Sequence, residues 1–293
     1  MIGERPQLKG LFIALLGVVA ISPDSLLIRL IAVDVWTLSF WRGLLLAITI
    51  TAVQGLRHGR HLTRGYRAVG RRGLLAGAVS GVGTVLFVSA VTYTTVANVL
   101  IIIGLAPLFA ALLGWLLLGE AVPLRTWIAI VAALAGTGIA VGGGIEGPRI
   151  GDLFAFGTAL CVAGYLTTIR SAGHDVDMTP CVVISGVITA GFCWPVADPL
   201  NVPGPSWPYL LALGIVIIPL SFTLITMAPR FIPAHEVSLV MLLEAILGPY
   251  LVWIVLEEYP GDHAILGGIV VISILSLHSL TALRTSRPES TSG

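Results

Sequence analysis

Three ionisable side chains interrupt otherwise apolar segments of this sequence, where they could take part in binding or proton transfer. They are Asp24 in segment 9–30, Arg42 in segment 34–56 and Glu244 near the middle of segment 234–257. Glu244 could act as a neutral hydrogen-bonding group, as a site of proton coupling or as a ligand for a substrate ammonium group. A structural hydrogen bond to another helix is the alternative role for this carboxyl group.

Asp24 and Arg42 carry opposite charges on neighbouring apolar segments. An ion pair between them would offset part of the cost of burying each charge. The two side chains could instead contact the amine and the carboxylate of a zwitterionic ligand. Both arrangements require the charges to face the interior of a helix bundle, as intramembrane charges usually do.

A cavity for a small amphipathic molecule also needs apolar and aromatic walls with a few polar groups. Seven residues on the apolar segments have suitable side chains. They are Trp41, Phe87, Tyr93, Asn98, Tyr165, Phe222 and Met241. Each aromatic ring could equally face lipid or fill a helix interface, whereas the Asn98 amide needs hydrogen-bonding partners. Together with the three ionisable residues, these seven form the candidate substrate-binding set.

Signals for enzymatic chemistry are weak. The histidines show no convincing metal spacing, and the sequence contains no Walker-type GK[ST] motif for nucleotide coupling. Three cysteines, all in apolar segments, argue against a disulfide framework. Positive charges are scattered between apolar segments, which argues against a nucleic-acid partner. We therefore expect no catalytic residue, no metal and no cofactor.

Composition places the elements that carry these residues in a lipid bilayer. Of 293 residues, 56% are hydrophobic and 11% are charged, and the mean hydropathy is +0.98. A soluble domain has about a quarter charged residues. Segments of roughly 20 apolar residues can cross the hydrocarbon core as helices. The candidates are 9–30, 34–56, 73–93, 95–118, 123–142, 150–170, 180–197, 206–228, 234–257 and 262–283. We expect an all-α membrane protein with ten transmembrane helices.

Lysine and arginine residues set the expected orientation of these spans. With a cytoplasmic N-terminus, most of them fall in cytoplasmic segments, as the positive-inside rule requires. The Arg-rich segment 57–72 fits such a topology signal better than a patch for nucleic acid or lipid. An even number of spans then places both termini in the cytoplasm.

An internal repeat divides the chain. Residues of the first half recur 138 positions later, and they include the scarce types Trp and Glu. The pairs are Ala90 and Ala228, Leu105 and Leu243, Leu113 and Leu251, Trp115 and Trp253, Leu118 and Leu256, and Glu120 and Glu258. The two repeats, 1–146 and 147–293, would hold five spans each. Because five is odd, the second repeat is inverted in the membrane, an arrangement that supports alternating access.

Some repeated positions look structural rather than functional. Glu120 and Glu258 fall where helices meet water, so we expect them to cap or anchor helix ends beside an interfacial Trp115. Pro107 and Pro249 lie in corresponding spans, about one helical turn apart in register. Paired interruptions in matching helices indicate a central binding site.

These residues resemble a known family. The stretch from Pro107 through Trp115 to Glu120 is similar to the signature of the drug/metabolite transporter superfamily, specifically its ten-span group with two EamA-type domains. The second copy is also similar, with Glu244 before Ala245 where the family often has Glu followed by Pro. The layout resembles that of bacterial exporters of aromatic and other neutral amino acids. This resemblance implies a multi-pass protein of the bacterial inner membrane.

The function implied is secondary transport. The resemblance predicts export of small amphipathic metabolites, in particular aromatic or other neutral amino acids, by alternating access through a central cavity. A drug or nucleotide-sugar carrier of the same superfamily is the alternative, and a channel or membrane-embedded enzyme is the alternative outside transport. The expected partners are the substrate, the lipid bilayer and protons coupled through Glu244 or Asp24, and the expected functional unit is a monomer.

Overall fold

The structure is a computed structural model that describes residues 6–58, 62–94, 96–141, 150–173 and 176–257, together with 266, 269, 270, 273, 274 and 277. Within these residues every regular element is a helix and no strand occurs. Apolar segments in lipid must satisfy their own backbone N–H and C=O groups, and a helix does so within one segment. The described residues therefore have the all-helical fold that the composition predicts.

The helices follow the expected apolar segments. The first half contains α1 (Pro6–Ile21), α2 (Asp24–Leu30), α3 (Val35–His58), α4 (Leu62–Tyr93), α5 (Val96–Ile103), α6 (Ala106–Leu118) and α7 (Leu124–Val141). The second half contains α8 (Ile150–Ser171), α9 (Pro180–Cys193), α10 (Trp207–Leu211), a π-helical turn (Ala212–Ile217), α11 (Ile218–Met227), α12 (Ala234–Met241) and α13 (Glu244–Leu256). Three expected spans are each built from two helices, namely α1 with α2, α5 with α6, and α12 with α13.

Six helical segments in the described part of the chain are long and apolar enough to cross a bilayer. Helices α6 and α9 and part of α7 are apolar but shorter. The expected tenth span, 262–283, falls mostly outside the described residues. These lengths and compositions are those of a multi-pass membrane protein.

Helix α4 begins earlier than the apolar pattern predicts. The third span was expected from residue 73, but the helix starts at Leu62 and changes direction at Gly70, whose φ of 51° and ψ of −146° are not helical. Apolarity reports only the part of a helix that lies in lipid. The arginine-rich turns before Gly70 extend the helix beyond that part.

The internal repeat is visible in the helix boundaries. Helices α5 and α6 begin at residues 96 and 106 and end at 103 and 118, and α12 and α13 begin at 234 and 244 and end at 241 and 256. Each boundary in the second half lies 138 residues after its counterpart. The repeat therefore preserves the two-helix build of this span as well as its sequence.

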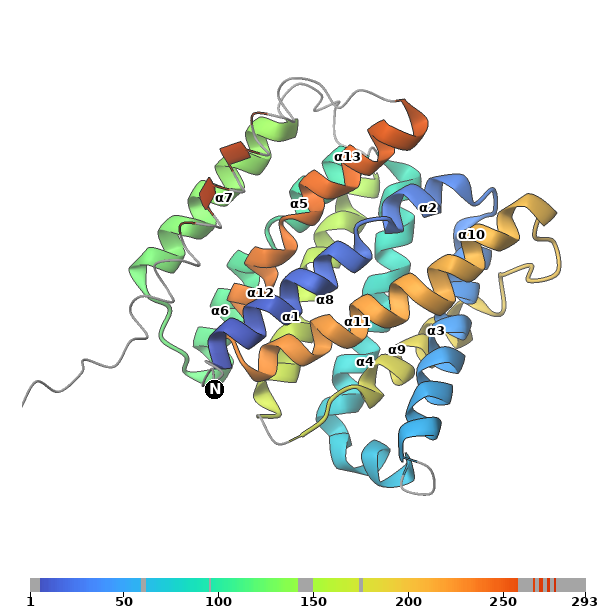
Figure 1. Ribbon diagram of the computed structural model, residues 1–293, viewed down its shortest axis with the longest axis horizontal. Coiled ribbons are helices and arrows are strands. Elements are labelled where there is room, and N and C mark those ends of the chain that lie inside the picture. The colour runs from blue at the N-terminus through green and yellow to red at the C-terminus, as the bar shows by residue number, and fades with distance from the viewer. Residues whose placement is uncertain are drawn as a thin grey trace, which may run out of the picture.

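Helices of the two repeats pack against each other in matching pairs. Figure 1 shows α1 beside α11. The matching pair is α8 with α4, and α3 packs against α9. A Cβ atom on Gly10 would lie 2.7 Å from the Phe231 side chain, and a Cβ atom on Gly151 would lie 2.7 Å from the Tyr93 backbone. Gly151 follows Gly10 by 141 residues, and Phe231 follows Tyr93 by 138. The same close contact is thus made twice.

The crossing of α3 and α9 is reciprocal. A Cβ atom on Gly43 would meet the Gly186 carbonyl oxygen at 2.6 Å, and a Cβ atom on Gly186 would meet the Gly43 carbonyl oxygen at 2.5 Å. Small residues allow such close backbone approach where lipid provides no hydrophobic drive for helices to associate. The two repeats meet here through equivalent residues.

Equivalent helices of the two repeats run in opposite directions. Gly10, near the start of α1, contacts Phe231. Arg170, at the end of α8, donates from Nη1 to the Pro229 carbonyl oxygen at 3.0 Å. The start of α1 and the end of α8 therefore lie at the same end of the bundle.

Candidate functional site

Three helices begin inside the bundle rather than at its ends. They are α2, α6 and α13, whose first residues are Asp24, Ala106 and Glu244. Before α6 and α13 the backbone forms hydrogen bonds between residues three apart. The Leu105 N–H donates to the Ile102 carbonyl oxygen and the Leu243 N–H donates to the Val240 carbonyl oxygen, both at 3.1 Å. A helix start leaves backbone N–H groups without partners in the helix. At α13 the preceding turn supplies partners for them, since the Ala245 and Ile246 N–H groups donate to the Leu242 and Leu243 carbonyl oxygens, both at 3.1 Å.

Proline does not explain both interruptions. Pro107 lies in the first turn of α6, directly after the turn at Leu105. In the second repeat the turn falls at Leu242 and Leu243, and α13 continues through Pro249. The paired interruption that we expected at Pro107 and Pro249 is therefore found at the residues before Ala106 and Glu244 instead.

Asp24 and Arg42 form a buried, two-pronged ion pair. Arg42 Nη2 donates to Asp24 Oδ2 at 2.9 Å, and Nη1 donates to Oδ1. The two side chains are 2% and 3% exposed. Bidentate pairs of this kind fix geometry as well as charge. Of the two arrangements open from the sequence, the structure shows the ion pair.

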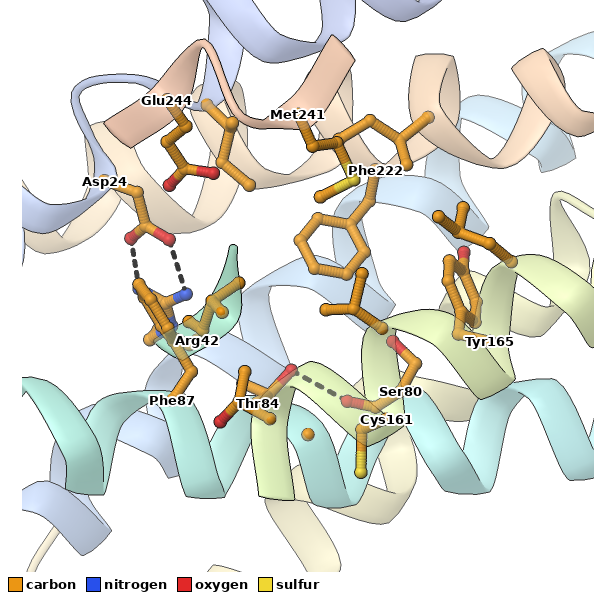
Figure 2. A pocket seen from close by; sticks show the side chains of 17 residues that line it. Asp24, Arg42, Ser80, Thr84, Phe87, Cys161, Tyr165, Phe222, Met241 and Glu244 are labelled. Carbon is orange, nitrogen blue, oxygen red and sulfur yellow. Dashed lines mark hydrogen bonds and ion pairs between the residues drawn. The ribbon is translucent and has the colours of Figure 1, made fainter. Parts of the chain in front are cut away.

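Glu244 lies beside this pair without joining it. Figure 2 shows its carboxylate directed from the start of α13 toward Asp24 and into the cavity. Within the described residues it makes no hydrogen bond or ion pair, although both Asp24 and Arg42 act on it electrostatically. The side chain is half-buried. A carboxylate with open hydrogen-bonding capacity therefore borders the cavity.

A cavity lies between the two repeats, and about 720 Å³ of empty space, part of it open to the outside, lies within its lining. Its apolar lining comes from Ile21, Phe87, Ile103, Val162, Leu166, Phe222, Ile225 and Met241, together with Gly83. Its polar lining comes from Asp24, Arg42, Ser80, Thr84, Thr158, Cys161, Tyr165 and Glu244. Figure 2 shows the charged side chains on one side, Tyr165 on the other, and the Phe222 ring between them. The cavity is therefore apolar with one charged end.

Most hydroxyl groups of the lining are already hydrogen-bonded. Thr84 donates to the Ser80 carbonyl oxygen at 3.1 Å, and Thr158 donates to the Phe154 carbonyl oxygen at 2.9 Å. Tyr165 is hydrogen-bonded to Thr226 on α11. These contacts leave the Glu244 carboxylate as the polar group of the lining with the greatest unused capacity.

The charged end has no counterpart in the other repeat. At the offset of 138, Glu244 corresponds to Ala106, and at the offset of 141, Asp24 corresponds to Tyr165. The reciprocal crossing of Gly43 and Gly186 makes Ser185 the counterpart of Arg42. Symmetric helices thus carry an asymmetric set of side chains around the cavity.

The structure brings seven of the ten candidate residues to this cavity. They are Asp24, Arg42, Phe87, Tyr165, Phe222, Met241 and Glu244. Trp41 does not line it, because its Nε1 donates to the Pro199 carbonyl oxygen at 3.3 Å and its ring packs on Trp207. Tyr93 is 53% exposed and packs on Phe154. Asn98 belongs to α5, but its side chain lies outside the described residues.

Sequence inspection missed the small polar residues of the lining. Ser80, Thr84 and Phe87 follow one face of α4, and Thr158, Cys161 and Tyr165 follow one face of α8. Spacings of three and four residues place side chains on the same side of a helix. A search for this spacing around Phe87 and Tyr165 could have found them.

An ion pair ties the repeats together at one end of the bundle. Arg170 Nε donates to Glu120 Oε1 at 2.7 Å, and Arg170 Nη1 donates to the Pro229 carbonyl oxygen. Glu120 follows Gly119, which ends α6 with a φ of 66°. Trp115 is 59% exposed, as an interfacial side chain would be. Glu258, the repeat counterpart of Glu120, lies outside the described residues.

Comparison with known proteins settles the family. The model of the EamA-like transporter family matches the chain twice, at residues 8–142 and 149–280. The chain belongs to the EamA-like transporter family. Both matched segments contribute to the cavity lining, so the cavity of this EamA-like transporter lies between its two repeats.

A solved crystal structure has the same fold. It is 18% identical to this EamA-like transporter, with a TM-score of 0.78 over 96% of this chain and 100% of the other. At this identity the likeness concerns the fold alone. A comparison with curated protein sequences finds no match.

Proposed function

We propose that this protein is a secondary transporter that exports small amphipathic metabolites, namely aromatic or other neutral amino acids, through the cavity between its repeats. The observation that carries the proposal is the cavity lining. Aromatic and apolar side chains surround the cavity, and the half-buried Glu244 carboxylate, which has no hydrogen-bond partner among the described residues, borders it. Sites for small molecules have the same mixture of apolar walls and few polar groups.

Alternating access is the mechanism we propose for this scaffold. It would have ten spans in two inverted five-helix repeats, 1–146 and 147–293, with segment 262–283 as the last span. The opposite directions of α1 and α8 and the reciprocal crossing of Gly43 and Gly186 support this arrangement. Two halves of the same build can exchange conformations and open the cavity to either side in turn.

The setting of the transporter follows from the same proposal. We place it in the bacterial inner membrane with both termini in the cytoplasm, because that orientation puts most arginines on the cytoplasmic side. The monomer is the proposed functional unit, because one chain carries both of the repeats that line the cavity. Proton coupling would involve Glu244, which borders the cavity, rather than Asp24, which is held by Arg42.

Counterflow into proteoliposomes tests the proposed function. Vesicles preloaded with unlabelled phenylalanine should accumulate labelled phenylalanine faster than empty vesicles, and the flux should saturate. Unlabelled neutral amino acids should compete, whereas sugars, nucleosides and bulky quaternary cations should not. Absence of inhibition by any amino acid would contradict the substrate class and favour a drug or nucleotide-sugar carrier.

The same assay separates the other classes of protein. Conductance without acceleration by substrate on the far side would identify a channel, and chemical alteration of the substrate would identify an enzyme. An imposed pH gradient should change the flux of the wild-type protein if protons are coupled. Glu244→Gln should abolish that response, and an unchanged response would exclude Glu244 as the coupling site.

A further inference from the structure

The positive and negative side chains of the cavity differ in how far their charge is already paired within the protein. Both terminal nitrogens of Arg42 already donate to the carboxylate of Asp24. The remaining Arg42 Nε is buried without a hydrogen-bond partner among the described residues. The pair uses two of the five guanidinium N–H donors and balances the charge of Arg42, so a ligand carboxylate would meet a cation that is already neutralised by Asp24.

Displacing Asp24 is unfavourable. Its side chain is 2% exposed, so separation from Arg42 would leave a carboxylate in the bundle interior without its partner. Breaking a buried pair from one side is strongly destabilising because the remaining charge stays buried. A ligand carboxylate would replace one anion by another at Arg42 and gain no new charge pair.

Glu244 offers the opposite charge. It borders the cavity and also an adjoining space lined by residues around both helix interruptions, including Ile103, Gly104 and Leu242. Asp24, Arg42 and Glu244 are the charged residues of the described lining. Since Asp24 and Arg42 neutralise each other, Glu244 is the group of this lining that can supply an unpaired negative charge, and a nearby ammonium group favours its ionised form.

We propose that the cavity selects its substrate through an ammonium group, which binds to Glu244, and does not recognise a substrate carboxylate. The inference rests on the proposed function, because it concerns the same cavity. The substrate class is a primary ammonium group on an apolar or aromatic body. Amines, amino-acid amides and amino-acid esters belong to it alongside the free amino acids.

The apolar walls complete this recognition. Phe222 and Met241 lie next to the charged end, and Phe87 lies beside Arg42 (Figure 2). An aromatic or aliphatic body can occupy this region while the ammonium group reaches Glu244. A free carboxylate on the same carbon atom would lie near the Glu244 carboxylate, and like charges repel. Neutralising that carboxylate should therefore strengthen binding.

Equilibrium binding to the purified full-length protein tests the inference. Isothermal titration calorimetry in detergent compares four ligands with the same phenyl body: 2-phenylethylamine, phenylalanine amide, phenylalanine and 3-phenylpropionate. The amine and the amide should bind at least as tightly as phenylalanine. 3-Phenylpropionate, which has no ammonium group, should bind on the order of tenfold more weakly or worse, as expected for loss of a charged hydrogen bond.

A matched variant identifies the carboxylate. Glu244→Gln should weaken binding of 2-phenylethylamine by a similar factor of roughly tenfold. Glu257→Gln, at the exposed far end of the same helix, should leave it unchanged. Equal affinity for 3-phenylpropionate and phenylalanine would overturn the inference, as would unchanged amine binding by Glu244→Gln. The ligand ranking uses the wild-type protein alone, so it decides the matter even if that variant does not fold.

Failure of the two proposals gives different results. Counterflow of phenylalanine without preference for an ammonium group would overturn only the inference. Ammonium-selective binding without counterflow would overturn only the proposed transport. Absence of binding by all four ligands would overturn the inference directly.

Discussion

Gly119 and Glu257 occupy equivalent positions 138 residues apart, and both end their helices in the left-handed backbone conformation, with φ of 66° and 56°. Glycine adopts this conformation without steric cost, whereas a residue with a Cβ atom does not. The end of α13 thus has the same backbone conformation as the end of α6, although Glu257 is less suited to that conformation than Gly119.

Replacing Glu257 by glycine should therefore stabilise the protein. We expect Glu257→Gly to raise the free energy of unfolding by up to about 1 kcal/mol. The mirror change Gly119→Ala should lower it by a similar amount. Thermal unfolding in detergent, followed by circular dichroism, measures both. A lower midpoint for Glu257→Gly would show that its side chain contributes more than its backbone costs.

The crossing of Gly43 and Gly186 should not tolerate a side chain. Gly43→Ala would place a methyl group 2.6 Å from the Gly186 carbonyl oxygen, so the helices must separate. We expect a loss of about 1–3 kcal/mol in stability, as for overpacked interiors. Gly55→Ala in the same helix is the control, because among the described residues no atom of a packing neighbour lies within 4 Å of its Cβ position. Equal unfolding midpoints for the two variants would refute the close crossing.

The ion pair of Asp24 and Arg42 should show strong coupling in a double-mutant cycle. Asp24→Leu alone leaves a buried guanidinium without its counter-charge, and Arg42→Met alone leaves a buried carboxylate without its counter-charge. Each should cost about 3–5 kcal/mol. Combining Asp24→Leu with Arg42→Met removes both charges and should recover much of that loss. Unfolding midpoints of the single and double variants measure the coupling. Additive effects would mean that the two side chains do not stabilise each other.

Asp34, between α2 and α3, should make stability depend on pH. Burial alone would raise the pKa of its carboxyl group, but hydrogen bonds from Thr37 and from the Trp36 backbone N–H outweigh burial and lower it. A carboxyl group with a lowered pKa in the folded state stabilises the fold above its unfolded pKa of about 3.9. That contribution is lost as the pH falls through the folded pKa.

Asp34→Asn isolates this effect, because the amide keeps an oxygen acceptor but carries no charge. The wild-type protein should unfold at a higher temperature than the variant at neutral pH, and the difference should shrink below a pH of about 4. Midpoints measured from pH 7 to pH 3 provide the comparison. A difference that stays constant over this range would assign the stabilisation to hydrogen bonding alone.

The most reliable predictions came from residue types that are energetically unfavourable or scarce in apolar segments. Charges in apolar segments are expensive, and Asp24, Arg42 and Glu244 all reached the cavity lining. The recurrence of Trp and Glu gave the offset of 138 that the boundaries of α12 and α13 reproduce. Both signals arise from constraints that few other residue types could satisfy.

The direction in which each side chain points could not be predicted from the sequence. Aromatic character does not distinguish a cavity wall from a helix interface, so Trp41 and Tyr93 were chosen on the same grounds as Phe87 and Phe222. Small hydroxyl residues such as Ser80 are common in membrane helix packing and gave no warning of the cavity. The helix interruption between Met241 and Glu244 contains neither proline nor glycine, so no helix-breaking residue marks it in the sequence.

The asymmetric charges have an energetic consequence for a carrier built from matching halves. In a carrier with two identical repeats, the two access states would be equal in free energy. In this chain the counterparts of Asp24, Arg42 and Glu244 are Tyr165, Ser185 and Ala106, so under the proposed alternating access an exchange of the two conformations would change the electric field around the cargo. The dissociation constants at the two membrane faces would then differ. Their ratio would equal the factor by which cargo shifts the equilibrium between the two states of the empty carrier.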